Sequence, residues 1–105
     1  MALSFFLEHE GLVAEISGDI DHHSAKYLRE EIDRACEKYL PKALYIDLSE
    51  LSFMDSSGIG LVLGRYRNMA KRGGDTYVIV PEGRIRKILT MAAADKLVKL
   101  LDKRP

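Results

Sequence analysis

The densest group of polar side chains in the sequence is Asp55-Ser56-Ser57-Gly58, which follows an apolar run and precedes a segment with helical spacing. Hydroxyl groups beside a carboxylate suit three kinds of chemistry, namely helix capping, nucleophilic catalysis and phosphorylation. Capping alone accounts for Asp55 and Ser56, because their side-chain oxygens accept hydrogen bonds from free N–H groups of a first helical turn. Capping does not explain the second adjacent hydroxyl, that of Ser57, so phosphorylation and nucleophilic catalysis remain possible roles for the segment.

Phosphorylation suits this position on electrostatic grounds. A phosphate adds about −1.5 to −2 charge, and a helix N-terminus offers unpaired N–H groups and the positive end of the helix dipole. The modification can therefore leave the fold intact while it changes the charge of the surface. The neighbouring Asp55 adds to the negative charge, so the segment has the properties of a switch for a docking partner.

Serine catalysis has weaker support in the same segment. A serine hydrolase needs an elbow of the type Gly-x-Ser-x-Gly together with an oxyanion hole, and the chain reads Met54-Asp55-Ser56-Ser57-Gly58. Hydrolysis is therefore a weak hypothesis, and we expect no catalytic residue and no enzymatic activity.

The glycines that follow do not form a phosphate-binding loop. The spacing of Gly58, Gly60 and Gly64 is one residue longer than that of Gly-x-Gly-x-x-Gly, and no Gly-Lys-Ser or Gly-Lys-Thr occurs in the chain. We expect no nucleotide cofactor. Gly60 and Gly64 lie on one helix face, which indicates either close packing of the helix against a sheet or the approach of a partner. Either role would offset a helix-propensity cost of roughly 1 kcal/mol each.

The segment Asp21-His22-His23 suggests a metal site at first sight. Consecutive histidines point in different directions at a helix start, the only other histidine is His9, and no cysteine is near. We therefore interpret Asp21 as a helix N-cap with two partly exposed histidines, and we expect no bound metal.

Charge and composition exclude several classes of protein. The 105 residues hold 16 basic and 16 acidic side chains, so the net charge is zero and general attraction to nucleic acid or an anionic membrane is not expected. Residues 1–50 carry −6 and residues 51–105 carry +6, either as two solvated sets or as opposed faces. With 47% hydrophobic residues, the length fits a single domain over 1–105.

Nothing in the sequence indicates export or membrane insertion. The apolar start lacks a basic region and a cleavage site, and no uncharged stretch is long enough to span a bilayer. The single cysteine, Cys36, cannot form an internal disulfide and fits a buried helical position. We expect a soluble, cytoplasmic protein.

Hydrophobic patterning predicts the element order strand, strand, helix, strand, helix, strand, helix. Glu10-Gly11 is expected to form the turn of an N-terminal hairpin, with positive φ at the glycine. The apolar face of the first helix comprises Ala25, Leu28, Ile32, Ala35 and Tyr39. In chain order the predicted elements are 4–9, 12–17, 25–39, 43–48, a loop at 49–55, 57–72, 76–80, a helix opened by Pro81, and a short element of undecided type at 97–101.

This order predicts an α/β fold with a mixed, mostly parallel sheet. Two strand-helix-strand crossovers imply parallel pairing, while the hairpin adds an antiparallel pair at one edge. With few helices available, we expect them mainly on one face. The carboxyl ends of such strands are the usual site of ligand and partner contacts, which is where Ser56 would lie.

One stretch of sequence, with flanking motifs, resembles the anti-sigma-factor antagonists of the STAS domain family. The resemblance runs from the first strand to about Met91. After Met91 the chain departs from the usual Met-Ser-Gly-Leu, which leaves open whether the family's last helix is absent or divergent. The residues that carry the resemblance are Leu51-Ser52-Phe53-Met54-Asp55-Ser56-Ser57-Gly58-Ile59-Gly60, Leu63-Gly64-Arg65-Tyr66 and Gly18-Asp19-Ile20-Asp21-His22-His23.

The resemblance implies a partner-switching function. The unmodified protein would bind an anti-sigma factor that is also an ATP-dependent serine kinase, and thereby release the sigma factor. Phosphorylation of Ser56 would end binding until a PP2C-type phosphatase removed the phosphate. Asp21 would lie near Ser56, and the partner surface would comprise Asp21, Asp55, Ser56, Ser57 and Gly58. The alternative is a STAS-like module that senses a small ligand or serves as a scaffold in a larger signalling assembly.

Overall fold

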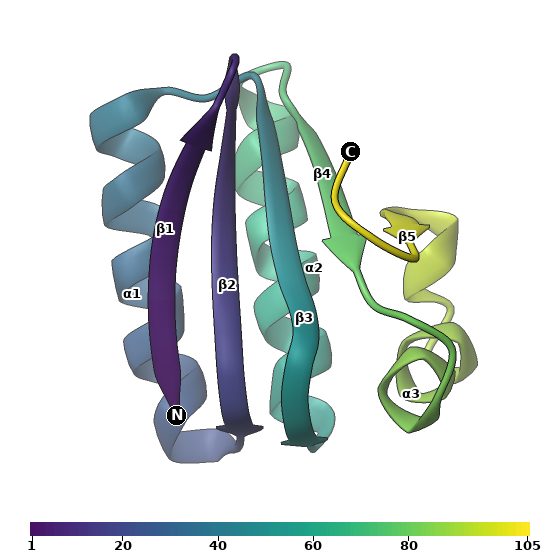
Figure 1. Ribbon diagram of the computed structural model, residues 1–105. Helices are drawn as coiled ribbons and strands as arrows, with labels where there is room; N and C mark the ends of the chain where they lie inside the picture. Colours follow the sequence, from purple (N-terminus) through teal and green to yellow (C-terminus); the bar gives the residue numbers. More distant parts are fainter.

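The computed structural model describes residues 1–105 and contains one five-stranded sheet with three α-helices (Figure 1). The strands lie in the order β1-β2-β3-β4-β5, with β1 and β2 antiparallel and the others parallel. The predicted fold class is therefore confirmed. The elements are β1 (Ala2–Glu8), β2 (Gly11–Ile20), α1 (His22–Tyr39), β3 (Ala43–Met54), α2 (Ser56–Lys71), β4 (Asp75–Ile79), α3 (Arg84–Met91), a 3-10 turn (Ala94–Lys96) and β5 (Lys99–Leu101).

The N-terminal hairpin forms as expected, but its turn differs from the prediction. Positive φ is found at His9, at 54°, and not at Gly11. Gly11 is needed for a different reason, because a Cβ atom there would lie 2.9 Å from the ring of Tyr45 on the neighbouring strand. The glycine thus allows a side chain to cross the backbone closely.

The third strand is longer than its apolar core suggested. The predicted loop at 49–55 is wrong, because β3 continues to Met54. Its second half pairs with the end of β2, from Ser17 opposite Glu50 to Ile20 opposite Met54, with one register shift just before this stretch and one inside it, between Gly18 and Asp19. The extension places Asp55-Ser56-Ser57-Gly58 directly after the carboxyl end of β3.

Helices α1 and α2 cover one face of the sheet, as predicted (Figure 1). In α1 the buried residues are Leu28, Ile32, Ala35 and Cys36, so Cys36 is buried as expected. Tyr39 was expected inside but is 42% exposed, because the helix ends there with Leu40 in the left-handed region at φ 47°. The sheet contributes an alternating set to the same core: Leu12, Ala14, Ile16, Leu44, Ile46, Leu48 and Val78.

The C-terminal part adds α3 and β5 beside β4 (Figure 1). The third helix begins at Arg84, three residues after Pro81, and buries Leu89 while Ile85 and Ile88 are half-buried. The segment of undecided type is a strand, since Lys99–Leu101 pairs in parallel with β4, and no helix follows it in residues 102–105. None of the helices is both long and apolar enough to cross a lipid bilayer.

The opposite face of the sheet carries an ion-pair cluster around Arg104. The Arg104 guanidinium donates to Asp47 at 2.8 Å and to Glu15, and it lies over the Phe6 ring. Arg65, also from the second half of the sequence, pairs with Asp33 of the first half. At these two places, basic residues of the second half of the sequence therefore pair with acidic residues of the first half.

Stability should depend on pH through Asp47. Burial opposes its ionisation, but hydrogen bonds from Ser49 and Arg104 outweigh burial and lower the pKa of Asp47. A lowered folded-state pKa contributes stability above the unfolded value of about 4, and this contribution is lost as pH falls through the folded value. We expect Arg104→Met to lower the free energy of unfolding by about 1 kcal/mol at pH 7, and by less at pH 3. Urea denaturation at both pH values measures this, and an equal loss at both would contradict it.

Candidate functional site

The strand-to-helix connections after β2 and β3 lie side by side. The two strands are parallel neighbours whose last residues, Ile20 and Met54, are register partners. The backbone N–H of Asp55 donates to the carbonyl of Ile20 at 3.1 Å. Asp21 and Asp55, the residues that follow these two strands, are therefore held close together at the carboxyl ends of the parallel strands.

Asp21 is the N-cap of α1, as predicted. Its Oδ1 accepts from the Ser24 N–H at 2.9 Å, and the Ser24 Oγ accepts from the Asp21 N–H at 2.9 Å. This reciprocal pair is a capping box. The hydrogen bond from Ser24 lowers the pKa of Asp21, so the exposed carboxylate is ionised at neutral pH.

Asp55 is the N-cap of α2, and Ser56 is the first helical residue. The Asp55 Oδ1 accepts from the Ser57 N–H at 2.8 Å, which satisfies one free donor of the first turn. Ser56 therefore has no capping task, and its side chain is exposed. Capping explains Asp55 but leaves the Ser56 hydroxyl without a structural role.

Gly58 is buried against Met54. A Cβ atom at this position would overlap Cγ and Sδ of Met54, whose side chain is 2% exposed. Gly60 and Gly64 behave differently, since a Cβ atom at either would meet nothing within 4 Å. The expectation that these two pack closely on the sheet is wrong, and the approach of a partner is the explanation that stays open.

The contrast between these glycines predicts opposite effects on stability. Gly58→Ala should lower the free energy of unfolding by about 1 to 2 kcal/mol, because the strain of overpacking exceeds the gain in helix propensity. Gly64→Ala, the matched control, should raise it by up to about 1 kcal/mol. Thermal and urea unfolding of both variants measures the difference, and a stabilised Gly58→Ala would contradict the described packing.

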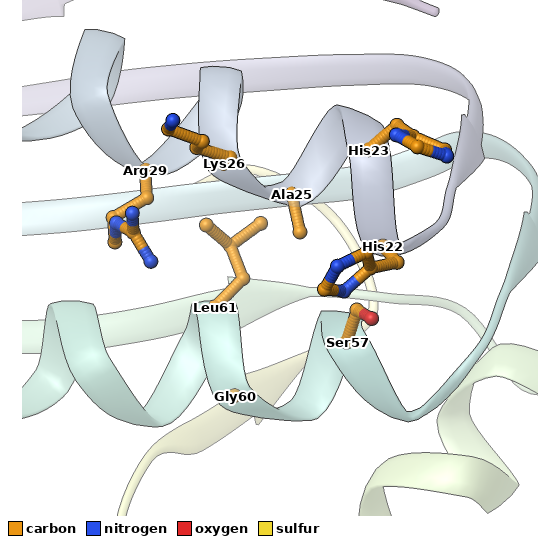
Figure 2. A pocket seen from close by; sticks show the side chains of 8 residues that line it. All are labelled: His22, His23, Ala25, Lys26, Arg29, Ser57, Gly60 and Leu61. Carbon is orange, nitrogen blue, oxygen red and sulfur yellow. The ribbon is translucent and has the colours of Figure 1, made fainter.

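An open groove of about 520 Å³ lies between the N-terminal halves of α1 and α2 (Figure 2). The His22 ring points across it toward Ser57, while His23 points away. The two histidines thus diverge as expected, and no three His, Cys, Asp or Glu side chains are grouped as a metal site requires. The remaining residues that line the groove are Ala25, Lys26, Arg29, Gly60 and Leu61.

The structure brings the predicted site residues together at one edge of the sheet. Asp21 and Ser56 are exposed, Asp55 and Ser57 are half-buried, and Gly58 is buried. Lys26 and Arg29 were not singled out from the sequence. Their spacing in the sequence indicates a shared position, because His22, Lys26 and Arg29 are four and three residues apart and therefore lie on one helix face.

A family model described as the STAS domain matches residues 7–104. The chain belongs to the STAS domain family. The resemblance seen in the sequence is therefore confirmed, and it extends beyond Met91 to nearly the end of the chain. This STAS domain is 32% identical over 104 residues to the anti-sigma F factor antagonist of Paenibacillus polymyxa, an alignment that spans 97% of this chain and 89% of that protein.

Solved structures show the same fold. The anti-sigma factor antagonist SpoIIAA in its unphosphorylated form is 28% identical to this STAS domain, with a TM-score of 0.82 over 97% of this chain and 90% of that one. SpoIIAA of Bacillus in the phosphorylated form is 29% identical, with a TM-score of 0.74 over 97% and 93%. An anti-sigma factor antagonist from Mycobacterium paratuberculosis is 25% identical, with a TM-score of 0.88 over 97% and 86%.

Proposed function

We propose that this STAS domain is an anti-sigma-factor antagonist controlled by phosphorylation of Ser56. Its unmodified form binds an anti-sigma factor, which then releases its sigma factor, and a phosphate on Ser56 ends this binding. The observation that carries the proposal is the exposed Ser56 hydroxyl, which stands on the first residue of α2 and takes no part in capping.

Similarity to known proteins supports the proposal. Two relatives, matched over 97% and 75% of this chain, are named anti-sigma F factor antagonists, and two matched over 81% are named anti-sigma-B factor antagonists. SpoIIAA was solved in unphosphorylated and phosphorylated forms. We further propose that the partner is an anti-sigma factor with ATP-dependent serine kinase activity, and that a PP2C-type phosphatase restores the unmodified form. The protein is then a substrate and a ligand in the cytoplasm, without cofactor or catalysis of its own.

The geometry explains how one phosphate would have a large effect. The docking surface comprises Asp21, Asp55, Ser56, Ser57 and Gly58. Gly58 is buried, and it contributes by allowing the first turn of α2 to pack closely on Met54. The unmodified hydroxyl is small and neutral beside the two capping carboxylates. A phosphate would add about −2 charge there, and a partner surface complementary to the unmodified form would meet like charge or lose shape complementarity.

The fold itself should tolerate the phosphate. A helix N-terminus stabilises negative charge through its free N–H groups and dipole, and Ser56 points into solvent. Phosphorylation would then change the docking surface and leave the core unchanged.

A displacement experiment tests the proposal. Purified complex of the cognate anti-sigma factor with labelled sigma factor is mixed with the protein, and fluorescence anisotropy follows sigma release. We expect release by the unmodified protein, loss of release after treatment with the kinase and ATP, and recovery after the phosphatase. Absence of binding to every anti-sigma factor of the source organism would contradict the proposal and favour the ligand-sensing or scaffolding alternative.

A further inference from the structure

We propose that the groove between α1 and α2 extends the docking surface and receives an acidic segment of the anti-sigma factor. This inference rests on the proposed function and names the chemistry of the partner that this part of the surface would recognise. The groove runs from Ser57, next to the phosphorylation site, along the facing sides of the two helices (Figure 2).

The charge of the groove points to an anionic occupant. Lys26 and Arg29 line its α1 wall, and no aspartate or glutamate is among the residues that line it. Neither Lys26 nor Arg29 forms an ion pair within the protein. This local positive charge lies in the half of the sequence that carries −6. The two cations are therefore free to pair with carboxylates of a partner.

On the α2 side of the groove, Gly60 has no side chain to project into it. Gly60 lines the groove and is exposed, and a Cβ atom there would meet nothing within 4 Å. Its φ also lies outside the left-handed region, so neither packing nor backbone conformation requires glycine at this helical position. Glycine is unfavourable inside a helix relative to alanine. A side chain at position 60 would narrow the groove, which gives Gly60 a role in admitting a partner segment.

The groove also connects binding to the phosphorylation switch. Ser57 lies at the mouth of the groove, and Ser56 is the adjacent residue on the first turn of α2. A phosphate on Ser56 would bring its negative charge to this end of the groove and compete with the acidic segment for the same cations. Phosphorylation would then weaken binding through electrostatics as well as bulk.

The first test reverses the charge of the groove. Lys26→Glu/Arg29→Glu is compared with Lys99→Glu/Lys103→Glu, a control with the same charge change at exposed positions on β5 and the tail. Isothermal titration with the cognate anti-sigma factor should show at least 30-fold weaker binding for the groove variant and less than 3-fold for the control. The wild-type affinity should fall more steeply between 50 and 200 mM salt than that of the groove variant.

The second test changes shape without changing charge. Gly60→Gln and Gly64→Gln both place a helix-favouring side chain on α2, and both should unfold at the same or a higher temperature than the wild type. Gly60→Gln should weaken binding at least 5-fold, while Gly64→Gln, which does not line the groove, should stay within 2-fold. A loss of affinity with unchanged stability cannot come from misfolding.

The outcomes separate this inference from the proposed function. If the wild type binds, Ser56→Asp loses binding, and the groove variants bind like the wild type, then the groove inference is wrong and the proposed function stands. If the wild type does not bind any anti-sigma factor, both are wrong.

Discussion

Ser56→Asp is expected to weaken binding to the cognate anti-sigma factor at least 100-fold, which corresponds to about 2.8 kcal/mol. The substitution places a carboxylate on the first residue of α2, beside the Asp55 carboxylate that caps the same helix. An unpaired charge brought into an interface costs several kcal/mol, because it is desolvated without a partner. Isothermal titration or biolayer interferometry measures the change directly.

Two substitutions at the same position separate charge from other effects. Ser56→Asn has nearly the shape of Ser56→Asp without its charge, so it should retain most of the affinity that the aspartate variant loses. Ser56→Ala should bind like the wild type but resist phosphorylation. All three should keep the wild-type melting temperature to within a few degrees, because Ser56 is exposed and makes no capping bond. Equal losses for Asn and Asp would contradict a charge-operated switch.

Asp33→Ala is expected to lower the free energy of unfolding by about 3 kcal/mol. The Arg65 side chain is only 6% exposed, and its Nε lies 2.8 Å from the Asp33 Oδ1 across the α1–α2 interface. Burial lowers the pKa of Arg65, while Asp33 opposes that shift. Removal of the carboxylate would leave a buried positive charge without its counter-ion, which is the costly way to break such a pair.

Arg65→Met provides the matched control for this prediction. It removes the buried charge and retains most of the apolar volume, so the free energy of unfolding should change by less than about 1 kcal/mol or increase. The double variant Asp33→Ala/Arg65→Met should recover most of the stability that Asp33→Ala loses. Urea denaturation of the four proteins measures the cycle, and a larger loss for Arg65→Met than for Asp33→Ala would show that the ion pair is not the cause.

The order and type of the elements were predictable because each helix and strand core carries its own pattern. Residues 43–48 and the helical spacing from Leu28 to Ile32 are examples. The extension of β3 through residues 49–54 was not predictable in the same way, because its polar residues become a strand only by pairing with the second half of β2. Tertiary pairing overrides local preference there.

The candidate site is also predictable only in part, because some of its features depend on local sequence and others on the packing of distant segments. The N-cap at Asp21 depends on neighbouring residues of the chain, so the sequence alone predicts it. The groove depends on two helices whose facing residues, such as Arg29 and Leu61, are 32 positions apart in the sequence. The spacing of Lys26 and Arg29 fits one helix face, but only the packing of α1 beside α2 shows that this face borders the groove that Ser57 also lines.

Localisation of the phosphate by mass spectrometry is the most direct test of the central claim. The protein is incubated with the cognate anti-sigma kinase and ATP, digested, and sequenced by fragmentation that resolves the adjacent serines. We expect one phosphate, on Ser56, and none in the Ser56→Ala variant. Phosphate on Ser57 or elsewhere with Ser56 unmodified, or no phosphate at all, would contradict the proposed switch.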